Sequence, residues 1–107
     1  MDDASAGGSY GSSPFGRLPH VSVQVYVRKI RVAAALEKLE RHVEMAWAAG
    51  LPWIEVVHGK GEGILREAVR DCLRRHRLVT RVYPAPPAQG GGGVTIAELA
   101  RHDEPSP

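Results

Sequence analysis

Residues 54–73 join a short apolar segment to an amphipathic one through the loop HGKGEG, in which three glycines alternate with other residues. The segment WIEVV, residues 53–57, is rich in β-branched residues and predicts a central strand. The segment after the loop repeats apolar residues at helical spacing and predicts a helix over about residues 64–76. A strand, a short glycine loop and a helix in this order are typical of α/β folds.

The flanking segments extend this pattern in both directions. VSVQVYV, residues 21–27, alternates apolar and polar residues and predicts a first strand. Residues 31–50 repeat apolar residues at helical spacing and end in stop signals at Gly50 and Pro52. LVTRVYP and GVTIAEL predict two further strands, separated by a Pro- and Gly-rich loop. The order β-α-β-α-β-β predicts an α/β two-layer sandwich with two helices over a mixed four-stranded sheet.

The length of 107 residues fits one domain, which we place at residues 20–100. Residues 1–19 are rich in Gly, Ser and Pro and predict a disordered linker or tail, and residues 101–107 predict a C-terminal tail. The linker suggests the end piece of a longer protein, although Met1 could equally have been added for expression. Cys72 is the only cysteine, which excludes an internal disulfide and favours a reducing cytoplasm. No apolar run reaches the ~18 residues of a membrane span.

Positive charge is concentrated in one part of the chain. The net charge is only +2, but residues 58–81 hold seven basic and three acidic residues. Arg66, Arg70 and Arg74 recur every four residues and predict one basic face of the second helix. This face is either a binding surface for a polyanion or simply a solvated helix surface.

The glycine loop suggests a phosphate receptor. A helix start leaves about four N–H groups unpaired and carries the positive end of the helix dipole. Gly59, Gly61 and Gly63 permit positive φ and close approach, so we expect their amides to form an outward nest for an anion. Lys60 adds a cation, and His58 can reach the same anion. The alternative is a plain tight turn with a structural histidine. Dinucleotide and Walker patterns do not match this loop.

The pattern His58-Gly59-x-Gly61-x-Gly63-x-Leu65-Arg66 resembles the H-G-x-G-x-G-x-L-R signature of the Smr (small MutS-related) domain family. RVAAALEKLE and GGGGVTIAEL look like that family's first helix and last strand, so the resemblance covers about residues 21–99. It looks closest to the C-terminal domain of the bacterial MutS paralogue outside mismatch repair. The resemblance implies a fold similar to the C-terminal domain of translation initiation factor three. It also implies binding or nonspecific nicking of DNA or RNA, links to recombination and collided ribosomes, and a longer MutS-type chain.

A second family motif departs from the usual L-D-L-H-G or L-D-L-R-G. The matching positions here are Val25, Tyr26, Val27, Arg28 and Lys29. Tyr26 replaces the usual aspartate, and a phenol with a pKa near 10 is a poor substitute for a carboxylate in hydrolysis. Lys29 replaces the usual glycine, which predicts a differently shaped turn. Two functions therefore stay open, a nuclease and a non-catalytic module that binds DNA, RNA or the ribosome.

The resulting site prediction names two groups of residues. His58 and Arg28 are the candidate catalytic residues, with a structural turn histidine and a surface strand end as the alternatives. The candidate phosphate-binding residues are Lys29, Gly59, Lys60, Gly61, Gly63, Arg66, Arg70 and Arg74. No residue is assigned as a metal ligand, but a divalent Mg²⁺ or Mn²⁺ stays open, with Glu62 and Glu67 beside the nest. Trp47 and Trp53 are expected in the core.

Overall fold

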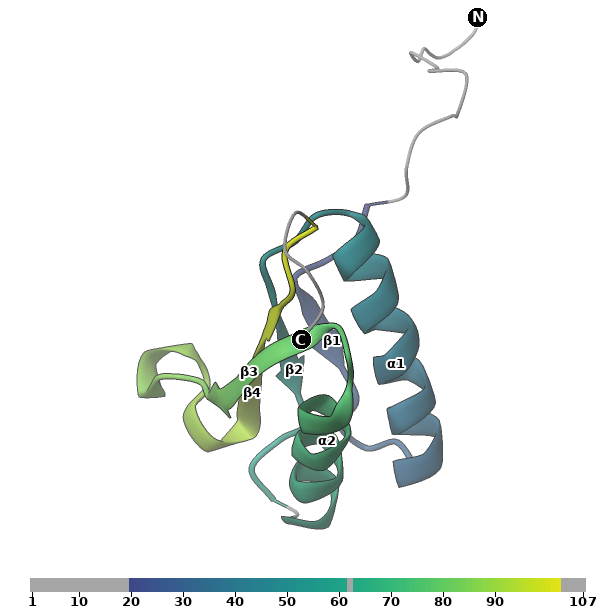
Figure 1. Ribbon diagram of the computed structural model, residues 1–107. Helices are drawn as coiled ribbons and strands as arrows, with labels where there is room; N and C mark the ends of the chain where they lie inside the picture. The colour runs from purple at the N-terminus through teal and green to yellow at the C-terminus, as the bar shows by residue number, and fades with distance from the viewer. Residues whose placement is uncertain (1–19, 62, 103–107) are drawn as a thin grey trace, which may run out of the picture.

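The computed structural model describes residues 20–61 and 63–102, so the predicted N-terminal tail, Glu62 and residues 103–107 of the predicted C-terminal tail lie outside the described residues. Two helices lie on one side of a four-stranded sheet (Figure 1), which confirms the predicted sandwich. The elements are β1 (Gln24–Tyr26), α1 (Val32–Ala48), β2 (Trp53–Val57), α2 (Gly63–Arg75), β3 (Val79–Pro84), the 3₁₀ turns η1 (Pro87–Gln89) and η2 (Gly91–Gly93), and β4 (Val94–Leu99). None of the helices in the described ranges is long and apolar enough to cross a membrane.

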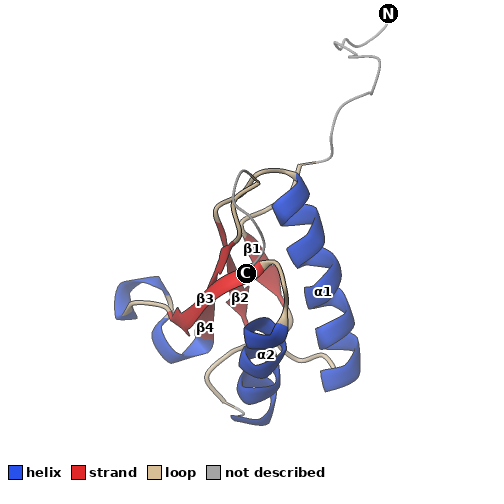
Figure 2. Ribbon diagram, in the orientation of Figure 1, coloured by secondary structure: helices blue, strands red, loops and turns tan. Residues whose placement is uncertain are grey.

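The strand order β1-β2-β4-β3 places β2 and β4 in the centre of the sheet, as predicted for residues 53–57. β1 runs parallel to β2, and β4 runs antiparallel to both of its neighbours, β2 and β3. Because β1 and β2 are parallel, their C-terminal ends lie at the same edge of the sheet. A helix follows each of them, so α1 and α2 both begin near this edge, at the bottom of Figure 2.

The core lies between the helices and one face of the sheet. Its members are Val25, Val27, Ala35, Leu39, Val43, Ala46, Ile54, Val56, Leu65, Val69, Leu73, Leu78, Ala97 and Leu99. The strand members alternate along β1, β2 and β4, as the period of two requires. Trp47 packs against this core, but the prediction that Trp53 is a core residue is wrong. Since Ile54 and Val56 face the helices, Trp53 points to the other face, where its side chain is 41% exposed.

Candidate functional site

A hollow of about 430 Å³ lies where β1 and β2 end and the two helices begin. It is lined by residues 28–32 and by His58, Gly59, Lys60, Gly61, Ile64 and Leu65. Six predicted site residues therefore meet here, namely Arg28, Lys29, His58, Gly59, Lys60 and Gly61. Arg31, which was not among the predicted site residues, also lines the hollow. Its position directly before the first predicted helix could have indicated that it belongs to the site. We call this region the basic hollow.

The basic hollow holds positive charge that nothing in the described chain neutralises. Arg28, Lys29, Arg31 and Lys60 form no ion pair or side-chain hydrogen bond with any described residue. The first turns of α1 and α2 contain no acidic residue, and α1 has no side-chain cap. The positive ends of both helix dipoles therefore add to the field of the four side chains. Such a field attracts an anion.

His58 faces the interior, contrary to the expectation that it reaches outward. β2 places Ile54, Val56 and His58 on the same face of the sheet, and the histidine is only 5% exposed. Its Nδ1 lies 2.9 Å from the carbonyl oxygen of Gly59, and its Nε2 lies 2.8 Å from Oγ1 of Thr95. Burial lowers the pKa of His58, the positive charges of Arg70 and Arg66 lower it further, and the Gly59 carbonyl opposes them. The ring is therefore neutral at neutral pH and engaged at both nitrogens.

The glycine loop is held against the turn before β4. The backbone amides of His58 and Gly59 both donate to the carbonyl oxygen of Gly93, at 3.1 and 2.9 Å. The expectation of three outward amides is therefore wrong for Gly59. Gly59 has a φ of +87°, and a Cβ placed on it would lie 3.9 Å from Cβ and Nε of Arg28. The Arg28 side chain thus lies across Gly59, which links the ends of β1 and β2.

The other two loop glycines differ from each other. Gly61 has no positive φ, and a Cβ on it would meet nothing within 4 Å, whereas a Cβ on Gly63 would lie 3.2 Å from Nη2 of Arg66. Lys29, in contrast, has a φ of +62°. This is the left-handed conformation that glycine adopts readily and other residues avoid. The lysine therefore occupies a turn conformation that glycine would adopt without strain, and the differently shaped turn stays a prediction.

The three arginines of the predicted basic face have different surroundings. Arg66 lies close to the start of α2 and forms a long ion pair of 3.9 Å with Glu67. The Nε of Arg70 donates to Oγ1 of Thr95 at 3.0 Å, so this side chain turns toward the sheet. Arg74 is exposed in the last turn. The three arginines thus follow one another along α2 as their spacing predicts, but the Arg70 side chain is engaged with Thr95.

Two groups expected to bear on hydrolysis are not assembled in the basic hollow. Tyr26 does not line the hollow, and its hydroxyl donates to Oε1 of Gln24 at 3.1 Å on the open face of the sheet. In the described ranges, no three His, Cys, Asp or Glu side chains gather as metal ligands. Glu67 is paired with Arg66, and Glu62 lies outside the described residues. The described residues therefore do not fit a divalent ion.

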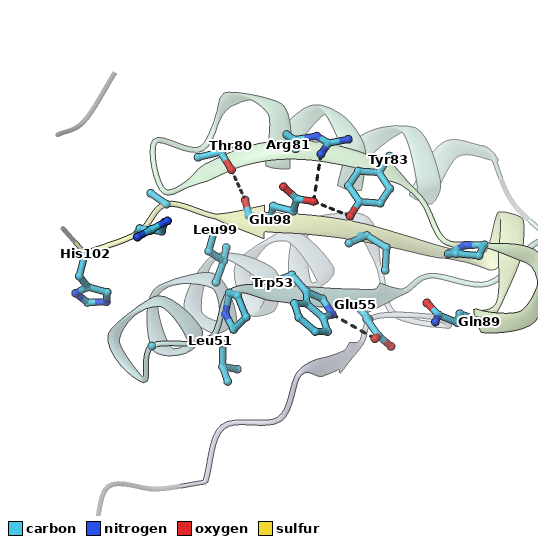
Figure 3. Close-up of a pocket in the computed structure, with 16 residues that line it drawn as sticks. Leu51, Trp53, Glu55, Thr80, Arg81, Tyr83, Gln89, Glu98, Leu99 and His102 are labelled. Atoms are coloured by element: carbon cyan, nitrogen blue, oxygen red, sulfur yellow. Dashed lines mark hydrogen bonds and ion pairs between the residues drawn. The ribbon is translucent and has the colours of Figure 1, made fainter. Parts of the chain in front are cut away.

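A larger hollow, of about 950 Å³, lies on the open face of the sheet (Figure 3). Several of its polar side chains form hydrogen bonds with one another. Glu98 accepts hydrogen bonds from the Tyr83 hydroxyl at 2.8 Å and from Arg81 at 3.5 Å, and the Glu98 bond raises the pKa of Tyr83. Glu55 accepts a long hydrogen bond of 3.4 Å from the Trp53 ring. This face therefore lacks the unpaired positive charge of the basic hollow.

Comparison with known proteins agrees with this architecture. The family model described as the Smr domain matches residues 26–100. Endonuclease MutS2 of Thermomicrobium roseum is 45% identical over 82 residues, which are 77% of this chain and 10% of that protein. The chain thus spans about a tenth of the length of the curated relatives it matches.

Two solved structures give the same result at the level of the fold. The crystal structure of the Smr domain of Thermus thermophilus MutS2 matches with a TM-score of 0.70 and 43% identity, over 72% of this chain and 96% of that chain. YdaL, a stand-alone small MutS-related protein from Escherichia coli, matches with a TM-score of 0.69 and 24% identity, over 81% of this chain and 70% of that chain. The likeness to translation initiation factor three stays a prediction. The chain belongs to the Smr domain family and is similar to the Smr domains of MutS2 proteins.

Proposed function

We propose that this Smr domain binds the phosphate backbone of DNA or RNA in the basic hollow. The observation that carries the proposal is the convergence on one hollow of two helix starts and four cationic side chains that pair with no described residue. Arg28 and Arg31 suit phosphate because a guanidinium can donate two parallel hydrogen bonds to its oxygens. Contacts of this kind read the backbone and not the bases, so binding is independent of sequence.

A phosphate-binding surface also fits the longer proteins in which similar domains occur. Those MutS2 proteins are about ten times as long as the matched region, and within such a chain this domain would supply a nucleic-acid contact in the cytoplasm. DNA, RNA and ribosomal RNA all present the same phosphodiester. Recombination intermediates and ribosomes are both partners that this contact would suit. Arg66 and Arg74 would extend the contact along α2.

The proposal is tested by the salt dependence of binding. Fluorescence anisotropy with a labelled oligothymidylate should show affinity falling steeply between about 50 and 200 mM salt, because each neutralised phosphate contributes about −0.7 to the slope for a single strand. Arg28→Ala and Lys60→Ala should each make the slope shallower by about 0.7. Arg41→Ala, at an exposed position of α1 outside the hollow, is the matched control and should leave the slope unchanged. Equal slopes for Arg28→Ala and Arg41→Ala would contradict the proposal.

Phosphodiester cleavage is a second candidate, supported by the name endonuclease that the MutS2 relatives carry. Arg28 and Lys60 would then stabilise the charge that develops on the phosphate oxygens. The engaged nitrogens of His58 and the position of Tyr26 on the other face support binding more directly than hydrolysis.

Incubation with supercoiled plasmid and with a structured RNA separates the two candidates. The wild type, Lys60→Ala and Arg41→Ala are each assayed twice, once in the presence of divalent ions and once in the presence of a chelator. Nicking that is lost only in Lys60→Ala supports cleavage at the hollow. Nicking equal in all three proteins points to a contaminating nuclease, and no nicking by the wild type leaves binding as the function.

A further inference from the structure

Thr95 is a fully buried polar residue on the face of the sheet that the helices cover. It lies on β4, on the face that also carries Ala97 and Leu99, and its exposed fraction is 0%. Its hydroxyl contacts side chains from two other parts of the chain. Nε of Arg70, from α2, lies 3.0 Å from Oγ1, and Nε2 of His58, from the end of β2, lies 2.8 Å from it.

The chemistry of the three groups fixes where the protons are. The carbonyl oxygen of Gly59 can only accept, so Nδ1 of His58, 2.9 Å away, carries the proton of the neutral ring and donates to that oxygen. Nε2 is then an acceptor, and the Thr95 hydroxyl donates to it at 2.8 Å. The same hydroxyl oxygen accepts the Nε–H of Arg70 at 3.0 Å. The hydrogen-bond network thus assigns one tautomer to His58.

The bond from Nδ1 also fixes the direction of the next peptide. The described chain contains no cis peptide bond, so the carbonyl and the N–H of the Gly59–Lys60 peptide point in opposite directions. With the carbonyl turned toward the His58 ring, the N–H of Lys60 points away from it. This N–H donates to no group in the described part of the chain, and Lys60 lines the basic hollow.

We infer that His58 is a positioning residue, which Thr95 and Arg70 hold so that it turns the Lys60 amide toward a bound phosphate. This inference rests on the proposed function. The histidine acts through the peptide and transfers no proton to the nucleic acid. Thr95 and Arg70 support the histidine from outside the hollow, because neither residue lines it. The Lys60 residue then supplies two donors, its ammonium group and its backbone amide.

NMR of the ¹⁵N-labelled wild-type chain tests the inference directly. The ring nitrogens of His58 should report a proton on Nδ1 and none on Nε2 at neutral pH. Titration with oligothymidylate should move the Lys60 amide proton downfield, as a new bond to a charged acceptor requires. A proton on Nε2, or a Lys60 amide that does not respond while the oligonucleotide binds, overturns the inference.

Thr95→Val and Thr95→Ser form the matched pair of variants. Valine keeps the shape and removes the hydroxyl, so the affinity should fall about tenfold and the Lys60 response should disappear, as expected for one lost donor to a charged group. Serine keeps the hydroxyl and should retain both the tautomer and the affinity. Equal affinities for the two variants overturn the inference and leave the proposed function standing. Absence of wild-type binding overturns the proposed function, while the ring-nitrogen signals still report the tautomer.

Discussion

At the scale of single residues, the basic hollow contains one backbone conformation that costs free energy. Lys29 has a φ of +62°, in the region that side chains with a Cβ disfavour by about 1–2 kcal/mol. Strain of this kind persists where the surrounding structure imposes it, and it is often found at functional sites. The turn between β1 and α1 imposes this conformation, and the lysine adds a cation to the hollow there.

Lys29→Gly should therefore stabilise the fold and weaken binding. Removal of the strain gains about 1–2 kcal/mol, and the greater freedom of glycine in the unfolded chain costs about 0.5–1 kcal/mol, so a net gain of up to about 1.5 kcal/mol is expected. Thermal unfolding and the anisotropy titration measure the two effects. Lys29→Ala is the control, because it removes the same charge and keeps the strain. A gain in stability as large for alanine as for glycine would show that strain is not the cause.

The neutral His58 should make stability depend on pH. Because its pKa is lowered from 6.5 by burial, the unfolded chain takes up a proton at pH values where the folded chain does not. Stability is therefore complete above pH 6.5 and decreases as the pH falls through the lowered pKa of the folded state. His58→Gln should flatten this part of the curve of melting temperature against pH. The exposed His20 offers the control, and His20→Gln should keep the wild-type curve.

At the scale of elements, the glycine loop and the η2 turn before β4 act as one unit. A Cβ on Gly93 would lie 3.1 Å from Cγ of Lys60 and 3.3 Å from the backbone of Gly59 and Lys60. Gly93→Ala should therefore displace the loop, cost about 1–3 kcal/mol of stability by overpacking, and weaken oligothymidylate binding. Gly92→Ala is the matched control, since a Cβ there meets nothing within 4 Å. Wild-type stability and binding in Gly93→Ala would exclude this coupling.

The elements themselves were predictable because their periods are clear in the sequence. Alternation in VSVQVYV and the β-branched run WIEVV locate β1 and β2, and apolar repeats locate both helices. The inward direction of the His58 side chain could also have been predicted from the sequence, since it continues the alternation of Ile54 and Val56. The same argument places Thr95 inward with Ala97. The spacing of the glycines alone suggested an exposed nest of amides. The alternation along the strands was the better guide to the direction of these side chains.

The contacts that shape the site could not be predicted from local patterns. Gly93 is far from Gly59 in the sequence, and only the pairing of β2 with β4 brings its carbonyl to the loop. The different contacts of Arg66, Arg70 and Arg74 have a similar origin. Their helical spacing is real, but Arg70 turns inward because Thr95 offers it an acceptor across the core.

At the scale of the whole molecule, the two faces of the sheet and its edge have different chemistry. One face is covered by the helices and is apolar apart from the network of His58, Thr95 and Arg70. On the open face Glu98 neutralises Arg81. The unpaired cations of the basic hollow lie at the edge where β1 and β2 end. A net charge of only +2 thus conceals a strongly positive edge, because charge position and not composition sets the local field.

The central position of β4 has a consequence for the order in which the domain is completed during synthesis. A ribosome makes β1, α1, β2, α2 and β3 before the strand that must enter between β2 and β3. The glycine loop is therefore translated long before Gly93 and Thr95, which clamp its backbone and its histidine. A nascent chain that ends before this strand has the cations of the hollow but not its geometry. The proposed phosphate contact would therefore be complete only once β4 has been made.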